Sequence, residues 1–343
     1  MMKVSVVILN WNGCDMLRTF LPSVVRYSEG EGVEVCVADN GSTDTSVSLL
    51  QQEFPSVRTI VLDQNYGFAD GYNWALQQVD AEYVVLLNSD VEVTEHWLEP
   101  MIAYLDKHPE VAACQPKIRS QRQKEYFEYA GAAGGFIDKY GYPFCRGRIM
   151  GVVEKDEGQY DTVIPVFWAT GAALFIRRTD YVNVGGLDGR FFAHMEEIDL
   201  CWRLRSRNRE IVCVPQSIVY HVGGATLKKE NPHKTFLNFR NNLVMLYKNL
   251  PQEELNKVMR IRTCLDYLAA FNFLLQGHWD NASAVMRARK EYKRLCPSFS
   301  LSREENMRKK TLNPIPERTK SSILWQFYAR GCKRFSQLSD LKG

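Results

Sequence analysis

The amino-acid sequence predicts an α/β fold in which a mostly parallel β-sheet is flanked by helices and followed by a helical extension. The first observation is that short β-branched apolar runs alternate with amphipathic segments through the first 90 residues. This rhythm is typical of βαβ units. The second observation is that polar residues follow the predicted strands, where ligands bind in such sheets.

Four buried strands are predicted in the first quarter of the chain, because each is a continuous apolar run too short for a typical helix. Glycine and aromatic residues enrich the segment 125–160, which we expect to be a loop region with a short hairpin. After residue 224 we expect helices. The predicted strands are residues 4–9, 33–38, 57–62, 83–87, 163–176 and 211–214, and the predicted helices are residues 15–27, 43–54, 69–79, 196–207, 236–250 and 258–275.

Charge divides the chain in two. Residues 1–225 hold 20 Lys/Arg and 30 Asp/Glu, whereas residues 226–343 hold 23 Lys/Arg and 10 Asp/Glu. We therefore predict an acidic body, residues 1–225, and a basic helical region, residues 226–343, that faces a polyanion. A solvated basic tail is the alternative.

Cysteine usage and hydropathy indicate the compartment. The nine cysteines have no CxxC or zinc-binding spacing, which favours a reducing environment over a disulfide framework. The chain starts with a strand pattern and not with a signal peptide. The longest charge-free apolar stretch of the basic half, residues 267–277, is too short to span a bilayer. We expect a cytoplasmic protein that is not integral to a membrane.

Asp90 and His221 are the candidate metal ligands. Asn88 and Asp90 directly follow the apolar run YVVLL, and His221 ends the strand-like run SIVYH. Oxygen ligands at a sheet edge suit Mg²⁺ or Mn²⁺ bridging the two phosphates of a nucleotide-sugar. An ordinary turn at Asn88 and Asp90, and a packed core histidine, are the alternatives.

Three carboxylates cluster at the start of a predicted helix. Glu196, Glu197 and Asp199 stand in HMEEIDLCWRLR, where acidic residues also favour the helix dipole. Apolar residues of the same helix would pack in the core and leave one acidic side chain exposed at the start of the helix. Such an acid can accept the proton of an attacking hydroxyl group.

Seven motifs, in order, resemble those of the family 2 glycosyltransferases of the GT-A (Rossmann-like) fold, closest to the rhamnosyltransferase-like branch. They spread over residues 4–224, about two thirds of the chain. These motifs are VSVVILNWN, VADNGSTD, NYGFADGYN, LLNSDVEV, ATGAALFIRR, FFAHMEEIDLCWRLR and VYHVGG.

The resemblance implies roles residue by residue. It makes residues 1–115 a nucleotide-binding half and residues 116–225 an acceptor half. Asn88 stands where many family members carry Asp, which is a departure in the metal motif. The implied roles are nucleotide binding for Asn10, Asn12, Asp39, Asn65, Asn73 and Asn88, metal binding for Asp90, His221 and Asn88, general base for Glu197 beside Glu196 and Asp199, and acceptor contact for Trp168, Thr170 and Gly171.

The activity that this resemblance implies is inverting, metal-dependent transfer from a nucleotide-sugar to a lipid-linked or polysaccharide acceptor. dTDP-rhamnose is the first candidate donor, and a UDP-hexose or UDP-N-acetylhexosamine is the alternative. Two other classes of protein are alternatives. A nucleotidyltransferase would carry a Gly-rich basic loop after the first strand, where this chain has NWNGCD. An inactive nucleotide-sugar-binding module would not need Asp90, Glu197 and His221 together.

The basic half suggests a partner surface. Near its end, KSSILWQFYARGCKRF interleaves Trp325, Phe327, Tyr328 and Phe335 with cations. This mixture suits the headgroup region of a membrane, so we expect peripheral docking at the cytoplasmic face of the inner membrane. Packing against the body or an oligomer contact is the alternative. The chain has no recognised nucleic-acid-binding motif.

Overall fold

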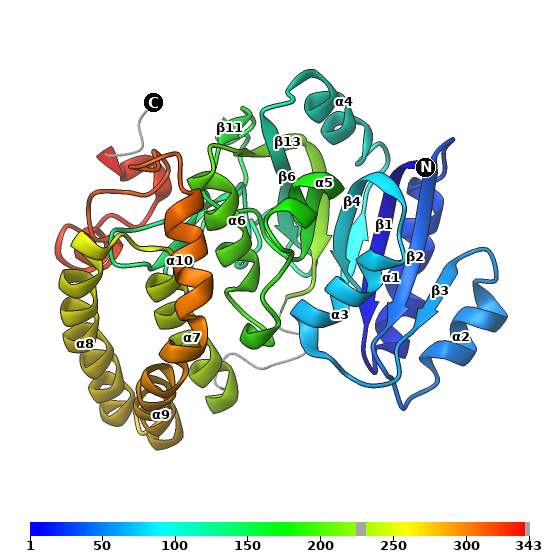
Figure 1. Ribbon diagram of the computed structural model, residues 1–343. Helices are drawn as coiled ribbons and strands as arrows, with labels where there is room; N and C mark the ends of the chain where they lie inside the picture. The colour runs from blue at the N-terminus through cyan, green and yellow to red at the C-terminus, as the bar shows by residue number, and fades with distance from the viewer. Residues whose placement is uncertain (224–230, 340–343) are drawn as a thin grey trace.

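The computed structural model describes residues 1–223 and 231–339. The predicted division between residues 225 and 226 falls outside these residues. Figure 1 shows a twisted sheet with helices on both faces and a group of helices from the basic half at one side.

The strands form one large and one small sheet. In the large sheet their order is β11-β13-β6-β12-β4-β1-β2-β3, with β5 also paired to β13, and the small sheet has the order β10-β9-β8-β7. The strands are β1 (Met2–Asn10), β2 (Val33–Asp39), β3 (Arg58–Val61), β4 (Ala81–Asn88), β5 (Val91–Val93), β6 (Val111–Ser120), β7 (Gly135–Ile137), β8 (Pro143–Cys145), β9 (Arg148–Ile149), β10 (Val152–Val153), β11 (Ile164–Pro165), β12 (Ala173–Arg177) and β13 (Glu210–His221).

Helices separate the parallel strands and make up most of the basic half. A 3-10 turn at Gly189–Phe191 precedes α6. The helices are α1 (Cys14–Tyr27), α2 (Ser46–Glu53), α3 (Gly67–Gln77), α4 (Glu99–Lys107), α5 (Arg178–Asn183), α6 (Glu196–Ser206), α7 (Pro232–Asn249), α8 (Gln252–Leu275), α9 (Trp279–Leu295) and α10 (Ser300–Lys309).

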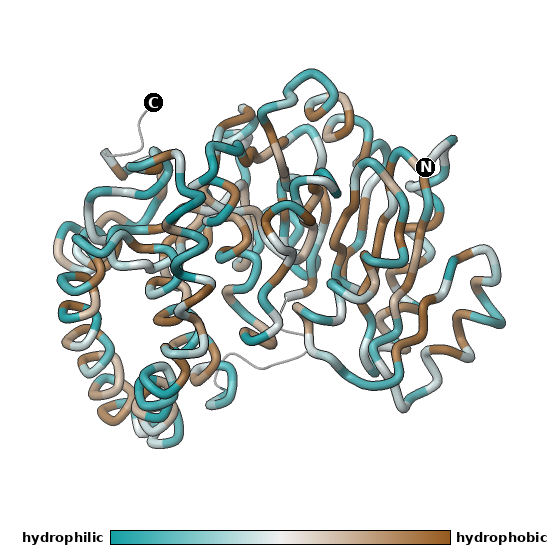
Figure 2. Tube along the Cα trace, in the orientation of Figure 1, coloured by the Kyte–Doolittle hydropathy of each residue, from teal (hydrophilic) through white to brown (hydrophobic). Residues whose placement is uncertain are grey.

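The continuous apolar strands are explained by burial on both faces. Val6 and Ile8 of β1 pack with α1, α2 and α4, whereas Val7 between them packs with α3 and α6. Successive side chains of a strand point to opposite faces, so both sets must be apolar when helices cover both sides. Figure 2 shows the resulting concentration of hydrophobic residues along the central strands.

The sheet is mixed, as the predicted "mostly parallel" class allows. β1 to β4 are parallel to one another, whereas β12 pairs antiparallel with both β4 and β6. Residues 163–176, predicted as one strand, form β11 and β12 with a buried connection between them. The predicted short strand at 211–214 extends as β13 to His221. It does so because it pairs with β6 along its length, through a bulge between Val214 and Ile218.

The basic half packs on the body and shares its core. Phe335 lies against Phe136, Phe144 and Tyr160, with ring centroids 5.0 to 6.3 Å apart. Phe327 is also buried, so two of the four aromatic residues expected to face a membrane are core residues. No helix of the described residues is long and apolar enough to cross a membrane.

Candidate active site

The carboxyl ends of β1 and β2 carry a buried polar pair. Asn10 and Asp39 are register neighbours, and Asn10 Nδ2 donates a hydrogen bond of 3.0 Å to Asp39 Oδ1. The second Asp39 oxygen accepts a bond of 2.9 Å from the amide of Ser42. Asn10 Oδ1 is buried and has no hydrogen-bond partner within residues 1–223 and 231–339. An unpaired buried oxygen is unfavourable, so a donor group of a ligand would be stabilised at this point.

Two further asparagines of the predicted nucleotide pocket shape the loops around this pair. Asn12 Oδ1 accepts bonds from the amides of Thr43 and Asp44, at 2.7 and 3.3 Å, and so joins the loops after β1 and β2. Asn65 Oδ1 accepts a bond of 2.8 Å from the amide of Gly67, the first residue of α3. Both side chains therefore hold the rim of the pocket in shape.

Asn73 has a structural position that differs from the predicted nucleotide contact. Its Oδ1 accepts bonds from Tyr181 Oη and the Leu187 amide, and its Nδ2 donates to Asp70 Oδ1 and Leu187 O, all within 2.6 to 3.1 Å. These are all four hydrogen bonds that an amide side chain can make. Asn73 therefore clamps the segment 181–187 to α3 and has no capacity left for a ligand.

The end of β4 meets the end of β13. His221 pairs with Val91 of β5, which places its ring beside Asp90. His221 Nε2 lies 3.1 Å from Asp90 Oδ1 and 3.5 Å from Asn88 Nδ2. Asp90 and His221 are 131 residues apart in the sequence, and they are neighbours because β5 and β13 pair antiparallel. Asn88 lies beside the same histidine.

A buried carboxylate that sequence reasoning missed completes this group. Glu128 Oε2 lies 3.6 Å from His221 Nδ1. Burial opposes a charge on the imidazole, but the hydrogen bond with Asp90 and the nearby negative charge of Glu128 outweigh it and raise the pKa of His221 to about 10. Burial likewise opposes ionisation of Asp90, yet the bond with His221 holds the pKa of Asp90 below its usual range. Glu128 stands in an irregular segment, EYFEYAGAAGG, with no pattern to single it out.

The donor set fits a divalent cation that is shared with phosphates. Within the described residues no three His, Cys, Asp or Glu side chains form a complete metal site. Asp90 and His221 would supply two adjacent ligands, and turning the Asn88 amide would point its oxygen toward them. Mg²⁺ in nucleotide sites is held in the same way, by one or two protein ligands with substrate phosphates and water completing the shell. A cation here would replace the proton of the His221 imidazolium.

Glu197 lies in the first turn of α6, after a strained segment. Phe192, His194 and Met195 all have positive φ, at 67°, 70° and 72°, a conformation that is costly for bulky residues. Glu197 is partly exposed, and its Oε2 has no hydrogen-bond partner among the described residues. Poor hydration outweighs the nearby backbone amides and raises the pKa of Glu197 to about 7. A carboxylate with these properties is suited to accept a proton near neutral pH.

The other two carboxylates of the cluster have different surroundings. Glu196 is buried, and this burial together with the neighbouring Glu197 raises the pKa of Glu196 well above its usual range. Asp199 is fully buried between the Lys248 ammonium, at 2.8 Å, and the Arg203 guanidinium, at 3.0 Å. Asp199 is therefore a structural ion-pair partner that ties α6 to α7, in place of the catalytic role predicted for it.

The buried connection between β11 and β12 links the two groups of polar residues. Ala172 O accepts a 3.0 Å bond from the Asn88 amide at the end of β4. A Cβ atom on the preceding residue, Gly171, would lie 3.8 Å from Glu197 Cβ and 3.1 Å from the Phe68 ring. The absence of a side chain at Gly171 thus lets the end of β4 and the first turn of α6 approach the same connection.

Trp168 and Thr170 lie in the interior, in contrast to the predicted acceptor contact. Trp168 Nε1 donates a 2.9 Å bond to Phe136 O, and its ring packs against Gly135. The Thr170 amide donates to Gln115 Oε1 over 3.0 Å. Both residues pack on the inner side of the segment between β11 and β12. Of the three predicted acceptor-side residues, Gly171 is the one that borders Glu197.

A family model described as Glycosyl transferase family 2 matches residues 5–172 of this chain. Residues 5–172 form a glycosyl transferase family 2 domain. The N-acetylglucosaminyl-diphospho-decaprenol L-rhamnosyltransferase of Mycobacterium tuberculosis is 28% identical over 230 residues, which are 63% of this chain and 75% of that protein. The O-antigen biosynthesis protein RfbC of Myxococcus xanthus is 26% identical over 231 residues, 66% of this chain but 18% of RfbC. The predicted family and its rhamnosyltransferase-like branch are thereby confirmed.

A solved structure confirms the predicted fold class. The crystal structure of GalNAc-T7 with UDP, GalNAc and Mn²⁺ superposes with a TM-score of 0.59 at 14% sequence identity, covering 93% of this chain and 59% of that one. At this identity the likeness is one of fold alone. The glycosyltransferase therefore has the GT-A architecture, including helices that follow the sheet.

Helix α7 of the glycosyltransferase holds the strained segment before Glu197. Asn241 Nδ2 donates to three backbone oxygens, those of Phe191, Ala193 and His194, over 3.0, 2.8 and 2.8 Å. Asn241 is 1% exposed, so these carbonyl groups have no water to replace the amide. The basic half thus supports the candidate catalytic helix directly, and it is more than an appended docking region.

We expect Asn241→Ala to lower kcat about tenfold to a hundredfold while changing the KM for the donor little, because the loop that aims Glu197 loses its clamp. The matched control is Asn238→Ala, one turn earlier in α7, whose amide bonds to Lys234 O in its own helix. Steady-state kinetics and a thermal melt of both variants test this. Equal kcat values for the two variants would show that the clamp does not position the base.

Proposed function

We propose that this chain transfers a sugar, first of all rhamnose from dTDP-rhamnose, to a hydroxyl group of a lipid-linked glycan, with inversion and with a divalent cation. The observation that carries the proposal is Glu197. Its side chain is partly exposed, and its buried Oε2 has no hydrogen-bond partner among the described residues. It borders Gly171, whose neighbour Ala172 accepts a hydrogen bond from the Asn88 amide. The names of the rhamnosyltransferase-like relatives suggest the donor and the lipid-linked acceptor.

Each group of site residues would have its own role in the reaction. Asp39 and Asn10 would bind the nucleotide base at the ends of β1 and β2. Asp90 and His221, with Asn88, would hold Mg²⁺ or Mn²⁺, which stabilises the negative charge on the departing nucleoside diphosphate. Glu197 would take the proton from the acceptor hydroxyl group. The oxygen of that hydroxyl group would form a bond to the anomeric carbon of the sugar as the bond between that carbon and the phosphate oxygen breaks.

One base on one side of the sugar supports inversion. Retention through a covalent intermediate needs a second carboxylate as nucleophile, but Glu196 is buried and Asp199 is held in ion pairs with Lys248 and Arg203. A UDP-hexose or UDP-N-acetylhexosamine is the second candidate donor for the same site. The site of action that we propose is the cytoplasmic face of a membrane that holds the acceptor.

We expect the purified chain to release dTDP from dTDP-rhamnose in the presence of a glycan acceptor and Mn²⁺, and to lose this activity in EDTA. Proton NMR of the product should show the anomeric configuration opposite to that of the donor. UDP-glucose and UDP-N-acetylglucosamine serve as competing donors in the same assay. Retained configuration would refute the single-base reaction, and full activity in EDTA would refute the role of the cation.

A further inference from the structure

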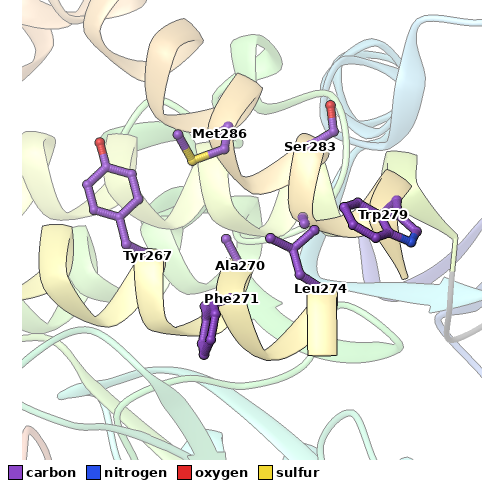
Figure 3. Close-up of a pocket in the computed structure, with 8 residues that line it drawn as sticks. Tyr267, Ala270, Phe271, Leu274, Trp279, Ser283 and Met286 are labelled. Carbon is purple, nitrogen blue, oxygen red and sulfur yellow. The ribbon is translucent and has the colours of Figure 1, made fainter. Parts of the chain in front are cut away.

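An apolar groove opens between the end of α8 and the start of α9. It has a volume of about 430 Å³ and is lined by residues of both helices. Figure 3 shows Tyr267 and Leu274 of α8 directed toward α9, which carries Trp279 and Met286, whereas the Phe271 ring points away from α9. Trp279 is 69% exposed and Phe271 is 57% exposed. Nothing in residues 1–223 or 231–339 covers this surface. Large apolar residues that remain exposed together indicate a binding surface.

The outer face of α8 continues this surface. Leu268, Phe271 and Leu275 follow one another at helical spacing, and Leu268 and Leu275 are 62% and 71% exposed. The segment 267–277 carries no charged residue. The apolar surface therefore runs along the last turns of α8 and over the turn into α9, and we call it the α8–α9 surface.

Cations border the α8–α9 surface. On the exposed side of α9, Trp279 and Met286 are followed at helical spacing by Lys290 and Lys293, both exposed. On α8, Lys257 and Arg260 are exposed toward the other end of the helix. An aromatic and aliphatic surface bordered by lysine and arginine is complementary to an anionic bilayer, in which apolar side chains enter the interface and cations meet the headgroups.

The α8–α9 surface is connected to the candidate active site through the start of α7. Thr235 Oγ1 donates a 3.0 Å bond to Asn281 Oδ1 in the first turn of α9. The adjacent Lys234 interacts electrostatically with Glu128, which contacts His221. In Figure 1 the turn between α8 and α9 and the carboxyl ends of the parallel strands both lie at the lower edge of the view.

We propose that the α8–α9 surface docks on an anionic lipid bilayer and so presents the mouth of the active site to a membrane-held acceptor. This inference rests on the proposed function for the nature of the acceptor. The proposed docking surface differs from the C-terminal segment that the sequence predicts to face a membrane. In that segment Phe327 and Phe335 are core residues, and Trp325 and Tyr328 are exposed.

Vesicle co-sedimentation of the full chain tests the proposal. The probe is a set of vesicles made of phosphatidylglycerol and phosphatidylcholine, compared with pure phosphatidylcholine. The test variant is Leu268→Ser/Phe271→Ser/Leu275→Ser, and the matched control is Trp325→Ser/Tyr328→Ser, which removes exposed aromatic residues elsewhere. All of these side chains are exposed, so circular dichroism should show unchanged folding.

We expect the test variant to bind anionic vesicles at least about tenfold more weakly than the wild type, because each exposed apolar side chain loses its burial in the interface. The control should stay within about twofold of the wild type. Lys290→Gln/Lys293→Gln should weaken binding to anionic vesicles and leave the weak binding to phosphatidylcholine unchanged.

Two outcomes would overturn the proposal. One is equal vesicle binding by the wild type and the test variant. The other is a wild-type dimer in sedimentation velocity that the test variant converts to a monomer without any change in vesicle binding, which would assign the surface to a second copy. Transfer to a water-soluble acceptor, measured on the same samples, separates these failures from a failure of the proposed function.

Discussion

Replacing Glu197 by Gln should lower kcat by about 10² to 10⁴, the range expected for a lost general base, and leave donor affinity nearly unchanged. The amide has almost the shape of the carboxylate but cannot accept the proton of the acceptor hydroxyl. Turnover measured with saturating donor, beside donor affinity from calorimetry, separates the two effects.

The pH dependence of kcat tests the assignment of Glu197 as the general base independently. Because poor hydration raises the pKa of Glu197 to about 7, a growing fraction of the base is protonated below that pH. The kcat of the wild type should therefore fall about tenfold per pH unit on the acid side. The Glu197→Gln variant should lack this limb. Glu196→Gln is the matched control, and a severe loss of kcat in that variant with a mild one in Glu197→Gln would reverse the assignment.

Replacing Asp90 by Ala should abolish cation binding and lower kcat by about 10² or more, since the departing diphosphate loses its charge stabilisation. Asp90 and His221 are 3.1 Å apart, and removing the carboxylate leaves the histidine with a single buried acidic neighbour, Glu128. Manganese binding, followed by electron paramagnetic resonance or calorimetry in the presence of dTDP, is the readout that does not depend on activity.

Glu92→Gln is the control for that experiment. Glu92 stands on β5, two residues beyond Asp90, and its side chain pairs with Lys124 at the surface. It should keep both Mn²⁺ binding and turnover. Unchanged Mn²⁺ affinity in Asp90→Ala would show that the cation does not bind at the end of β4.

Local sequence patterns were sufficient for the parallel half of the sheet. The continuous apolar runs at β1, β2 and β4 arise because both faces of these strands are buried, and this burial is a local property of each run. The positions of Asn10, Asp39 and Asp90 follow from it, because parallel strands bring their carboxyl ends to one edge. The acidic group in the first turn of α6 could also be recognised from the sequence, because it is a dense local motif.

Contacts between distant segments decided the rest. The sequence placed Glu196, Glu197 and Asp199 in one motif, but the helix directs Asp199 into an ion-pair network with α7, 49 residues away. Glu128 reaches His221 from an irregular segment that no periodicity marks. Asn73 appeared to belong to the pocket, yet it is saturated by partners up to 114 residues away.

By itself, the sequence determined the fold class, the family and the residues at the strand ends, because strand burial and the family motifs are encoded over short stretches. The tertiary structure decided which carboxylate of the cluster remains available for a ligand, and which aromatic residues of the basic half are core and which are exposed. Burial and hydrogen bonding of a side chain depend on segments that meet only in the folded chain. Phe335, buried against Phe136, and Phe271, exposed on α8, look alike in the sequence and differ for that reason.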